Sequence, residues 1–303
     1  METTQPALGS RQLRQIVLIT IGAVAVFVFL RFLPTGTNLN HMDFRVNAKN
    51  AIEYCDPLNP QFIPVVAVAS PVTMTLASEP LAAGRPAQLT LTLSTASGKQ
   101  IEPVDLLVAH TKLLHLLVVD PTLTDYQHVH PQPGKKRGEW TFAFTPRHGG
   151  AYRVFADFTP AATSRGLYAS ADLAVAEASG VGDKPAESPT AGGYRFELTP
   201  AGGAIRAGKT ADLQFAVTRP DGSAVPLEPV MGAFAHLVAF DEARSGFAHL
   251  HPAETDLEKK PDEKRPVLTF KITIPRAGRY VIWSQVKLGD VEVFTPFWFE
   301  VAP

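Results

Sequence analysis

Residues 115–131 read HLLVVDPTLTDYQHVHP, and residues 236–252 read HLVAFDEARSGFAHLHP. Both stretches have a histidine, an aspartate five positions later, and a His-x-His-Pro motif thirteen positions after the first histidine. They contain six of the nine histidines of the chain. Because so long a pattern occurs twice, the chain is expected to hold two copies of one structural unit.

The copies also agree outside these stretches. A strand-like segment and a Gly-x-Tyr motif follow each of them, ending at Tyr152 in the first copy and at Tyr280 in the second. Five residues beyond each tyrosine stands a polar side chain, Asp157 or Gln285. The repeat unit is about a hundred residues long, which is the size of a domain.

Charge and cysteine content narrow the classes of function. The 303 residues carry a formal net charge of −1, and no basic stripe runs along the sequence. A protein that binds nucleic acid neutralises phosphates with lysine and arginine, so this composition argues against that class. The only cysteine, Cys55, cannot form a disulfide within the chain. It is expected to be a small, partly buried residue, with intermolecular pairing or metal contact as the alternatives.

An apolar segment near the N-terminus has the length of a membrane span. Residues 16–33 carry one charge, at Arg31, and as a helix they would measure roughly 27 Å, close to the hydrocarbon thickness of a bilayer. Arg11 and Arg14 favour a cytoplasmic tail over residues 1–15 and an extracytoplasmic remainder. No convincing cleavage site follows, so we expect a single-pass transmembrane helix or uncleaved signal anchor whose partner is the lipid bilayer.

Composition divides the rest of the chain. Residues 34–70 predict an irregular connector and residues 177–193, rich in Gly, Pro and Ser, predict a flexible linker. The two repeat units are residues 71–176 and 194–303. Their short alternating or β-branched segments are typical of sandwich strands. The expected strands of the first unit are 72–76, 88–93, 105–109, 114–119, 128–130, 140–145, 151–158 and 167–175, and those of the second include 194–198, 211–217 and 291–301.

The predicted fold class is all-β, with two tandem immunoglobulin-like or cupredoxin-like β-sandwiches after one N-terminal transmembrane helix. Pro296 has no backbone N–H, so the last strand is expected at a sheet edge or with a bulge. No helical run is expected outside the membrane segment.

The histidines of each copy are expected to converge. If residues 115–120 and 126–130 are antiparallel neighbours, a register that places His115 opposite His128 brings His130 to the same side. Three imidazoles gathered in this way bind Zn(II) or Cu(II) and leave one coordination position open. Neither stretch contains cysteine or methionine, which excludes a blue-copper centre. The predicted metal ligands are His115, His128 and His130 in the first copy and His236, His249 and His251 in the second.

Three further residues bear on this prediction. Asp157 and Gln285 are expected to hydrogen-bond to ligating imidazoles and fix their tautomers, and the change from acid to amide means that the two sites need not be equivalent. His110 is a surface residue or a fourth ligand of the first site, and it has no histidine counterpart in the second copy. No role is assigned to His41 or His148.

A structural role for the same histidines is the alternative. The face that they share also carries large apolar residues, namely Leu117, Val119 and Tyr126 in the first copy and Val238, Phe240 and Phe247 in the second. On such a face, neutral histidines can hydrogen-bond to backbone and bind no ion. Duplication does not separate the two interpretations, since a duplicated domain also repeats its structural residues.

On the two His-x-His-Pro stretches and the Gly-x-Tyr segments, the chain resembles bacterial exported or membrane-anchored proteins that carry tandem immunoglobulin-like domains. The resemblance covers roughly residues 70–303. It implies a β-sandwich fold and an extracytoplasmic location, and some of these relatives occur in metal-handling contexts.

Together these observations predict a membrane-anchored extracytoplasmic protein that binds copper or zinc at the cell envelope, for storage, delivery or protection. The alternative is a structural or adhesive envelope protein that binds no cofactor and docks an envelope protein partner. The motif places no serine or carboxylate as nucleophile or general base, so no enzymatic activity is expected.

Overall fold

The computed structural model describes residues 9–31, 39–44, 61–177 and 190–303 of the chain. The chain divides into two units, residues 1–38 and 39–303. Residues 1–8 of the predicted tail, the end of the predicted span at 32–33, Cys55 with most of the connector, and residues 178–189 of the linker lie outside the described residues.

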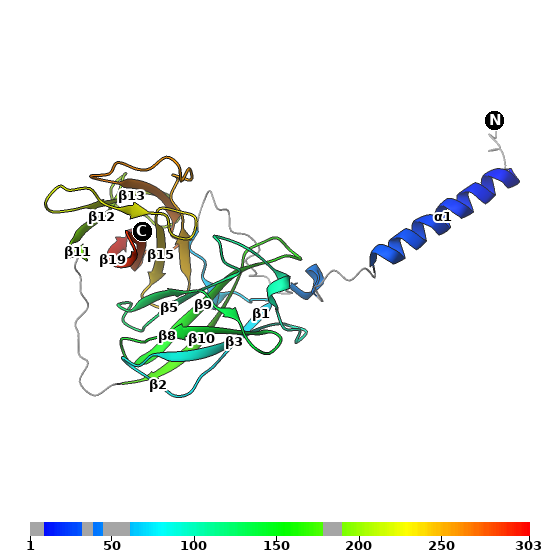
Figure 1. The fold of residues 1–303 in the computed structure, drawn as a ribbon, viewed down its shortest axis with the longest axis horizontal. Coiled ribbons are helices and arrows are strands. Elements are labelled where there is room, and N and C mark those ends of the chain that lie inside the picture. Colours follow the sequence, from blue (N-terminus) through cyan, green and yellow to red (C-terminus); the bar gives the residue numbers. More distant parts are fainter. Residues whose placement is uncertain (1–8, 32–38, 45–60, 178–189) are drawn as a thin grey trace. The chain divides into compact units, whose positions relative to one another are not determined.

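The first unit contains one helix, α1 (Ser10–Arg31), which is shown in Figure 1. Its 22 residues measure about 33 Å, enough to cross the hydrocarbon core of a bilayer. Residues Ser10–Leu30 have a mean hydropathy of 2.3, and none of these residues is buried within the protein. The predicted helix is therefore present over its described residues, and it begins earlier, so that Arg11 and Arg14 belong to its first turns.

The first sandwich consists of two sheets built from residues 72–176 (Figure 1). One sheet has the order β1 (Val72–Ala77), β3 (Ala87–Thr95), β8 (Glu139–Phe144) and β7 (Gln132–Pro133). The other has the order β2 (Leu81–Ala82), β10 (Leu167–Ala176), β9 (Gly150–Pro160), β5 (Leu114–Val119) and β6 (Tyr126–Val129), and β4 (Leu106–Leu107) pairs with β9. Alternate residues of β3 and β8 are buried, because one face of their sheet covers the core around Trp140.

The second sandwich repeats this arrangement. One sheet has the order β11 (Thr190–Ala191), β12 (Tyr194–Pro200), β13 (Thr210–Thr218) and β17 (Val267–Thr273). The other has the order β14 (Leu227–Glu228), β18 (Gly278–Leu288), β15 (His236–Asp241) and β16 (Phe247–Leu250), and β19 (Val291–Val301) pairs with β18. The strands β5, β6 and β9 thus correspond to β15, β16 and β18, so the sequence repeat is also a structural repeat.

These strands confirm the predicted all-β class and its sandwiches. The segment 105–109 is the exception, since only Leu106–Leu107 pairs there, after a short 3-10 turn at Pro103–Asp105. Pro296 lies in β19, which is an edge strand as expected: within the described sheet it pairs only with β18. Apart from α1, the described residues contain only short 3-10 helices, at His41–Phe44, Val65–Ala67 and Pro103–Asp105.

Strand β5 is buried at all six positions because both of its faces are covered. Leu116 and Val118 point into the core of the first sandwich, whereas Leu117 and Val119 join a separate cluster. We call this cluster the interface cluster, because it contains residues of both sandwiches. Its buried members are Ile63, Val65, Leu117, Val119, Leu123, Tyr126, Phe155, Val238, Phe240, Phe247, Val281 and Trp283. The apolar face that resembled a core in the sequence is therefore the contact between the two copies.

The end of the connector, residues 61–67, lies on the second sandwich, although it precedes the first in sequence. Ile63 exchanges two backbone hydrogen bonds with Phe247 at the edge of β16, and Phe62 enters the core of the second sandwich. Gly246 makes this approach possible, because a Cβ atom there would lie 1.8 Å from the carbonyl oxygen of Ile63. This part of the predicted irregular connector thus joins a sheet edge.

Candidate metal centre

The first histidine trio consists of His115, His128 and His130, and we call it the first-copy trio. His115 lies at the start of β5, His128 lies in β6, and His130 follows the end of β6. The hairpin is present as predicted, but the predicted register is wrong by two residues, since His128 pairs with Leu117 and not with His115. The loop sets this register: Asp120 accepts the backbone N–H of Thr122, Thr124 and Asp125, which closes the turn so that Val119 faces Tyr126.

The three imidazoles of this trio nevertheless converge, because His115 and Leu117 share one face of β5. The ring centroids of His115 and His128 are 5.3 Å apart, those of His115 and His130 are 5.0 Å apart, and those of His128 and His130 are 4.7 Å apart. One nitrogen atom of each ring lies within 4.8 Å of the other two.

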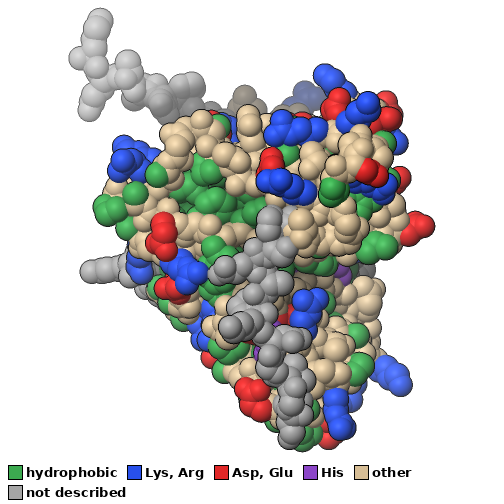
Figure 2. All heavy atoms as spheres, turned by 90° about the vertical axis from the view of Figure 1, so that its left-hand side faces the viewer, with side chains coloured by type: hydrophobic (Ala, Val, Ile, Leu, Met, Phe, Trp, Pro, Cys, Tyr) green, Lys and Arg blue, Asp and Glu red, His purple; other side chains and the backbone are tan. Residues whose placement is uncertain are grey.

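The second-copy trio, formed by His236, His249 and His251, has the same geometry. Its ring centroids are 5.6, 4.8 and 4.7 Å apart, and one nitrogen of each ring again lies within 4.8 Å of the others. His236 begins β15, and His249 pairs with Val238 as its counterpart pairs with Leu117. All six predicted ligands are therefore brought together in two groups. On the face drawn in Figure 2 the histidines show only as small purple patches, and His115, His128 and His236 are buried.

In four of the six rings, a hydrogen bond from outside the trio determines which nitrogen carries the proton. Nε2 of His115 lies 3.0 Å from the carbonyl oxygen of Ala109, and Nε2 of His236 lies 2.9 Å from that of Val230. A carbonyl oxygen only accepts, so both Nε2 atoms are protonated in the neutral ring and both Nδ1 atoms keep a lone pair. The sequence repeat gave no sign of these backbone acceptors, because a carbonyl belongs to every residue type.

In His128 and His249, Nδ1 is the donor, and its acceptor belongs to the opposite copy. His128 Nδ1 lies 2.8 Å from Gln285 Oε1. The Gln285 amide is oriented by its Nε2 atom, which donates to Glu292 Oε2 at 2.8 Å, so Oε1 must accept from His128. His249 Nδ1 lies 3.3 Å from Asp157 Oδ2. Both predicted partners therefore hydrogen-bond to a predicted ligand, and both do so across the contact between the sandwiches.

The remaining nitrogens point into the trios without a protein partner. Nδ1 of His236, Nε2 of His249 and Nε2 of His251 are buried and unpaired, as is Nε2 of His130 in the first copy. Leaving a buried polar atom unpaired costs roughly 1–3 kcal/mol, so four such atoms in two small groups need an explanation. A metal ion at the centre of each trio would provide one.

The remaining pair of the first-copy trio supports the same explanation. His115 Nδ1 and His128 Nε2 lie 3.1 Å apart, and with the tautomers described above both atoms carry lone pairs. A proton does not bridge them at neutral pH, because burial lowers the pKa of His115 to about 4 and that of His128 well below its ordinary value. A dication fits, since tetrahedral ligand nitrogens at about 2.0 Å from a metal lie roughly 3.3 Å apart.

The other trio members are likewise neutral at physiological pH. Burial lowers the pKa of His236 to about 4, that of His130 to about 3 and that of His251 to about 2. Burial also lowers the pKa of His249, and it raises the pKa of Asp157 to about 7. Neutral imidazole is the form that binds a metal ion, so the environment holds the ligands ready.

His110 comes from the first copy but packs on the second-copy trio. Its ring stacks on that of His251 with centroids 3.8 Å apart, and it lies 6.2 Å from His115. Its shortest ring contact is therefore with the second-copy trio and not with the first-copy trio, for which it was a candidate ligand. His110 and Thr111 have φ angles of 46° and 68°, which makes them the central residues of a strained turn between Ala109 and Lys112.

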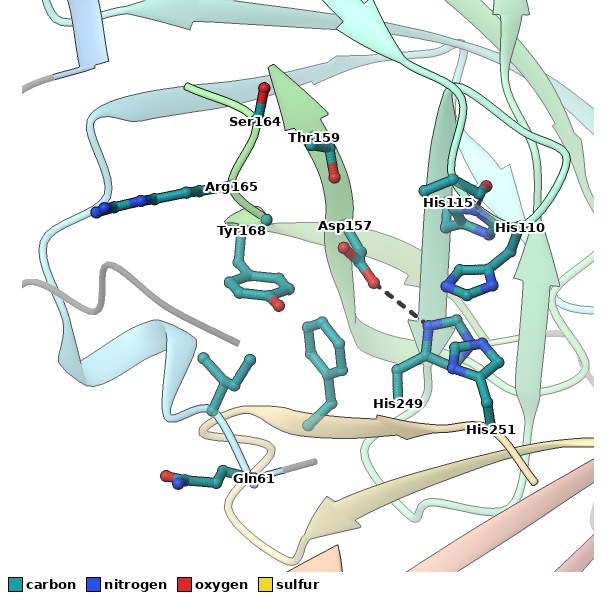
Figure 3. A pocket seen from close by; sticks show the side chains of 14 residues that line it. Gln61, His110, His115, Asp157, Thr159, Ser164, Arg165, Tyr168, His249 and His251 are labelled. Atoms are coloured by element: carbon teal, nitrogen blue, oxygen red, sulfur yellow. Dashed lines mark hydrogen bonds and ion pairs between the residues drawn. The ribbon is translucent and has the colours of Figure 1, made fainter. Parts of the chain in front are cut away.

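A cavity of about 380 Å³ reaches the trios from one side (Figure 3). One wall is formed by imidazoles from both copies, His110, His115, His249 and His251. Asp157 lies in the cavity with its carboxylate turned towards His249, as Figure 3 shows. Tyr168 lies on the other side of Asp157 from these imidazoles, and Phe247 also lines the cavity. An ion or a small molecule can therefore approach ligands of both trios through a single opening.

Comparison with known families gives one match. The family model described as a domain of unknown function, DUF8832, matches residues 67–173 and 189–303, which together are more than two thirds of the chain. No curated protein matches the chain.

Several solved structures are similar in fold. The adhesin FdeC of Escherichia coli has 18% identity and a TM-score of 0.24, and the match covers 77% of this chain and 64% of that chain. A putative membrane-anchored protein from Corynebacterium diphtheriae has 11% identity and a TM-score of 0.25, covering 78% and 60%. Fibronectin(III)-like modules of CbhA from Clostridium thermocellum have 11% identity and a TM-score of 0.20, covering 76% and 93%. The chain thus spans less than two thirds of the first two.

Proposed function

The chain belongs to the DUF8832 family, and we propose that it binds two divalent transition metal ions, Cu(II) or Zn(II), one in each histidine trio. The observation that carries this proposal is a set of six ring nitrogens in the two trios that have no hydrogen-bond partner outside the trios. Four of them are buried without a partner, and the other two face each other at 3.1 Å. Every outward nitrogen of His115, His128, His236 and His249 has an acceptor that fixes its tautomer, as is usual for imidazoles that bind a metal.

The chemistry of the ligands favours copper or zinc. Imidazole is a borderline ligand that suits both ions, and three protein nitrogens leave a position for water or another small ligand. The motif stretches hold no thiolate or thioether, so a Cu(I) site of the sulfur type is not proposed. The biological role that we propose is storage, delivery or protection against these ions at the cell envelope, with no catalytic activity.

The proposed location follows from α1. Arg11 and Arg14 at its start favour a cytoplasmic N-terminus, and we propose that both sandwiches lie on the other side of the membrane. In that compartment the protein would meet exogenous metal ions before they reach the cytoplasm.

Equilibrium dialysis of the full-length protein in detergent tests metal binding. Wild type is expected to retain two ions of Zn(II) or Cu(II) per chain, counted by atomic spectroscopy after dialysis against a weak chelator. The variant His128→Ala/His249→Ala, which removes one ligand from each trio, should retain none. His148→Ala is the matched control, because that histidine belongs to neither trio. The proposal fails when wild type and the double variant retain equally little metal.

A second candidate is a structural or adhesive envelope protein that binds no metal. One of the solved structures reported above, FdeC, is an adhesin. Two observations favour it. The histidines His115 and His236 bond to backbone carbonyls as structural histidines do, and the interface cluster by itself could hold the copies together. This candidate leaves the four unpaired nitrogens unexplained, and for that reason it ranks second.

A further inference from the structure

The two trios lie almost as close to each other as their own members do. The rings of His128 and His249 are 5.4 Å apart, those of His115 and His249 are 5.9 Å apart, and those of His128 and His236 are 6.4 Å apart. An ion lies about 3 Å from the centroid of a ligating ring, given a metal–nitrogen distance of about 2 Å. Two ions bound by His128 and His249 would therefore be at most about 12 Å apart.

The two side-chain acceptors that fix tautomers are exchanged between the copies. The main chain of Asp157 in β9 pairs with that of His115, yet its carboxylate bonds to His249. The main chain of Gln285 in β18 pairs with that of His236, yet its amide bonds to His128. Each trio therefore has its ligands in one sandwich and its side-chain hydrogen-bond acceptor in the other.

Several polar contacts hold the copies in this position. Trp283 Nε1 donates to the carbonyl oxygen of Leu123 at 3.2 Å. Arg153 donates to the carbonyl oxygen of Arg244 at 3.0 Å, and Arg244 donates in return to that of Ala151. Together with the buried interface cluster, these contacts position the exchanged acceptors.

We propose that the two trios form one paired metal centre shared by the two sandwiches, in which Asp157 is a positioning residue for the second-copy site and Gln285 for the first-copy site. This inference rests on the proposed function. A carboxylate bonded to the distal nitrogen of a metal-binding imidazole makes the ring a stronger ligand than a neutral amide does, and it compensates part of the charge of the ion. The second-copy site consequently fills first when metal is limiting.

Single-site variants of the full-length protein in detergent test the exchange. His130→Ala leaves only the second-copy trio complete, and His251→Ala leaves only the first-copy trio complete. In the His130→Ala background, Asp157→Asn is expected to weaken Zn(II) binding by about 10- to 100-fold. In the His251→Ala background the same substitution should leave the Zn(II) affinity unchanged, although Asp157 is the main-chain neighbour of His115.

Gln285→Met keeps the length of the side chain but removes the acceptor. It should weaken Zn(II) binding in the His251→Ala background and leave the Zn(II) affinity unchanged in the His130→Ala background. Asp212→Asn is the matched control, because this exposed aspartate pairs with Lys271 outside the metal centre. The exchange is disproved when Asp157→Asn weakens the first-copy site of its own sandwich, or weakens neither site. The absence of any metal in wild type is a different result, and it would overturn the proposed function itself.

A separate experiment tests whether the two ions lie close together. Protein loaded with two Cu(II) ions should show dipolar broadening in its electron paramagnetic resonance spectrum, because the ions lie within about 12 Å. The two single-site variants should each show a sharp spectrum of one isolated ion. A spectrum of wild type equal to the sum of the single-site spectra would contradict the paired centre.

Discussion

The Oδ2 atom of Asp157 lies 3.3 Å from Nδ1 of His249, 92 residues further along the chain and in the other sandwich. The counterpart of Asp157 in the second copy, Gln285, makes the reciprocal contact with His128. Each copy therefore supplies three imidazoles to one site and one acceptor to the other. The contact between the two sandwiches is consequently part of the candidate metal centre.

Metal ions should stabilise the folded protein. An ion that binds only the folded state at one hundred times its Kd adds about 2.7 kcal/mol to the free energy of unfolding. We expect Zn(II) or Cu(II) to raise the Tm of the full-length protein in detergent, measured by circular dichroism of the β-sheet signal. Mg(II) should have no effect, because it prefers oxygen ligands. A rise of the same size in His128→Ala/His249→Ala would show that the ion acts elsewhere, and no rise in wild type would favour the second candidate.

The metal-free protein should lose stability as the pH falls below about 6.5. In the folded state the pKa of His115 and of His236 is about 4, against an ordinary value of 6.5. Between these values the unfolded chain binds protons that the folded chain does not, so acid favours unfolding by up to about 1.4 kcal/mol per pH unit for each histidine. The stability from these histidines is thus present above pH 6.5 and is lost towards pH 4.

Asp157 has the opposite effect on the pH dependence of stability. Its pKa is raised to about 7, so below that pH the folded state keeps a proton that the unfolded chain has lost. The effect of this one aspartate on the free energy of unfolding does not offset the combined effect of the trio histidines. Urea unfolding of the metal-free protein at several pH values measures the slope, and His115→Gln/His236→Gln should reduce it. A free energy of unfolding that stays constant between pH 7 and pH 5 would refute this account.

Gly246→Ala should detach residues 61–67 from the second sandwich. The new Cβ atom would lie 1.8 Å from the carbonyl oxygen of Ile63, so the backbone must move and Phe62 loses its place in the core. We expect a destabilisation of about 1–3 kcal/mol and faster proteolysis within this segment. Gly202→Ala is the matched control, since nothing lies within 4 Å of a Cβ atom there. Equal proteolysis of the two variants would show that the segment is not held by this contact.

Thr111→Gly should stabilise the protein. Thr111 has a φ of 68°, which is strained for a β-branched residue, whereas the corresponding turn of the second copy has Gly232 at φ 80°. Relief of this strain exceeds the entropy that glycine adds to the unfolded chain, and the net gain should be up to about 1 kcal/mol. The reciprocal variant Gly232→Thr should destabilise the protein. Chemical denaturation measures both, and two changes of the same sign would contradict the explanation.

The hairpin of each copy was predictable because its information is local. The alternation of apolar residues and the polar loop lie within sixteen residues, and the predicted strand 114–119 agrees with β5. The register was not predictable, because it depends on how Asp120 closes the loop by accepting three backbone N–H groups. The predicted convergence of the histidines is nevertheless correct, because a register shift of two residues keeps a side chain on the same face of the sheet.

The role of the apolar residues beside the histidines could not be read from the sequence. Leu117 and Phe240 look the same whether they face a core of their own sandwich or a partner surface, because burial in either place removes the same area from water. In the structure they belong to the interface cluster. The sequence therefore left a metal site and a structural core as competing interpretations of one face.

By itself, the amino-acid sequence determined that two copies of a β-sandwich follow an apolar helix, and that each copy gathers three histidines on one face. These properties depend on spacings within a strand or a hairpin. Only the tertiary structure decided that the two histidine faces meet, that Asp157 and Gln285 exchange partners, and that residues 61–67 join the second sandwich. Docking of this kind results from many weak apolar contacts between residues far apart in the chain, and no spacing in the sequence encodes their sum.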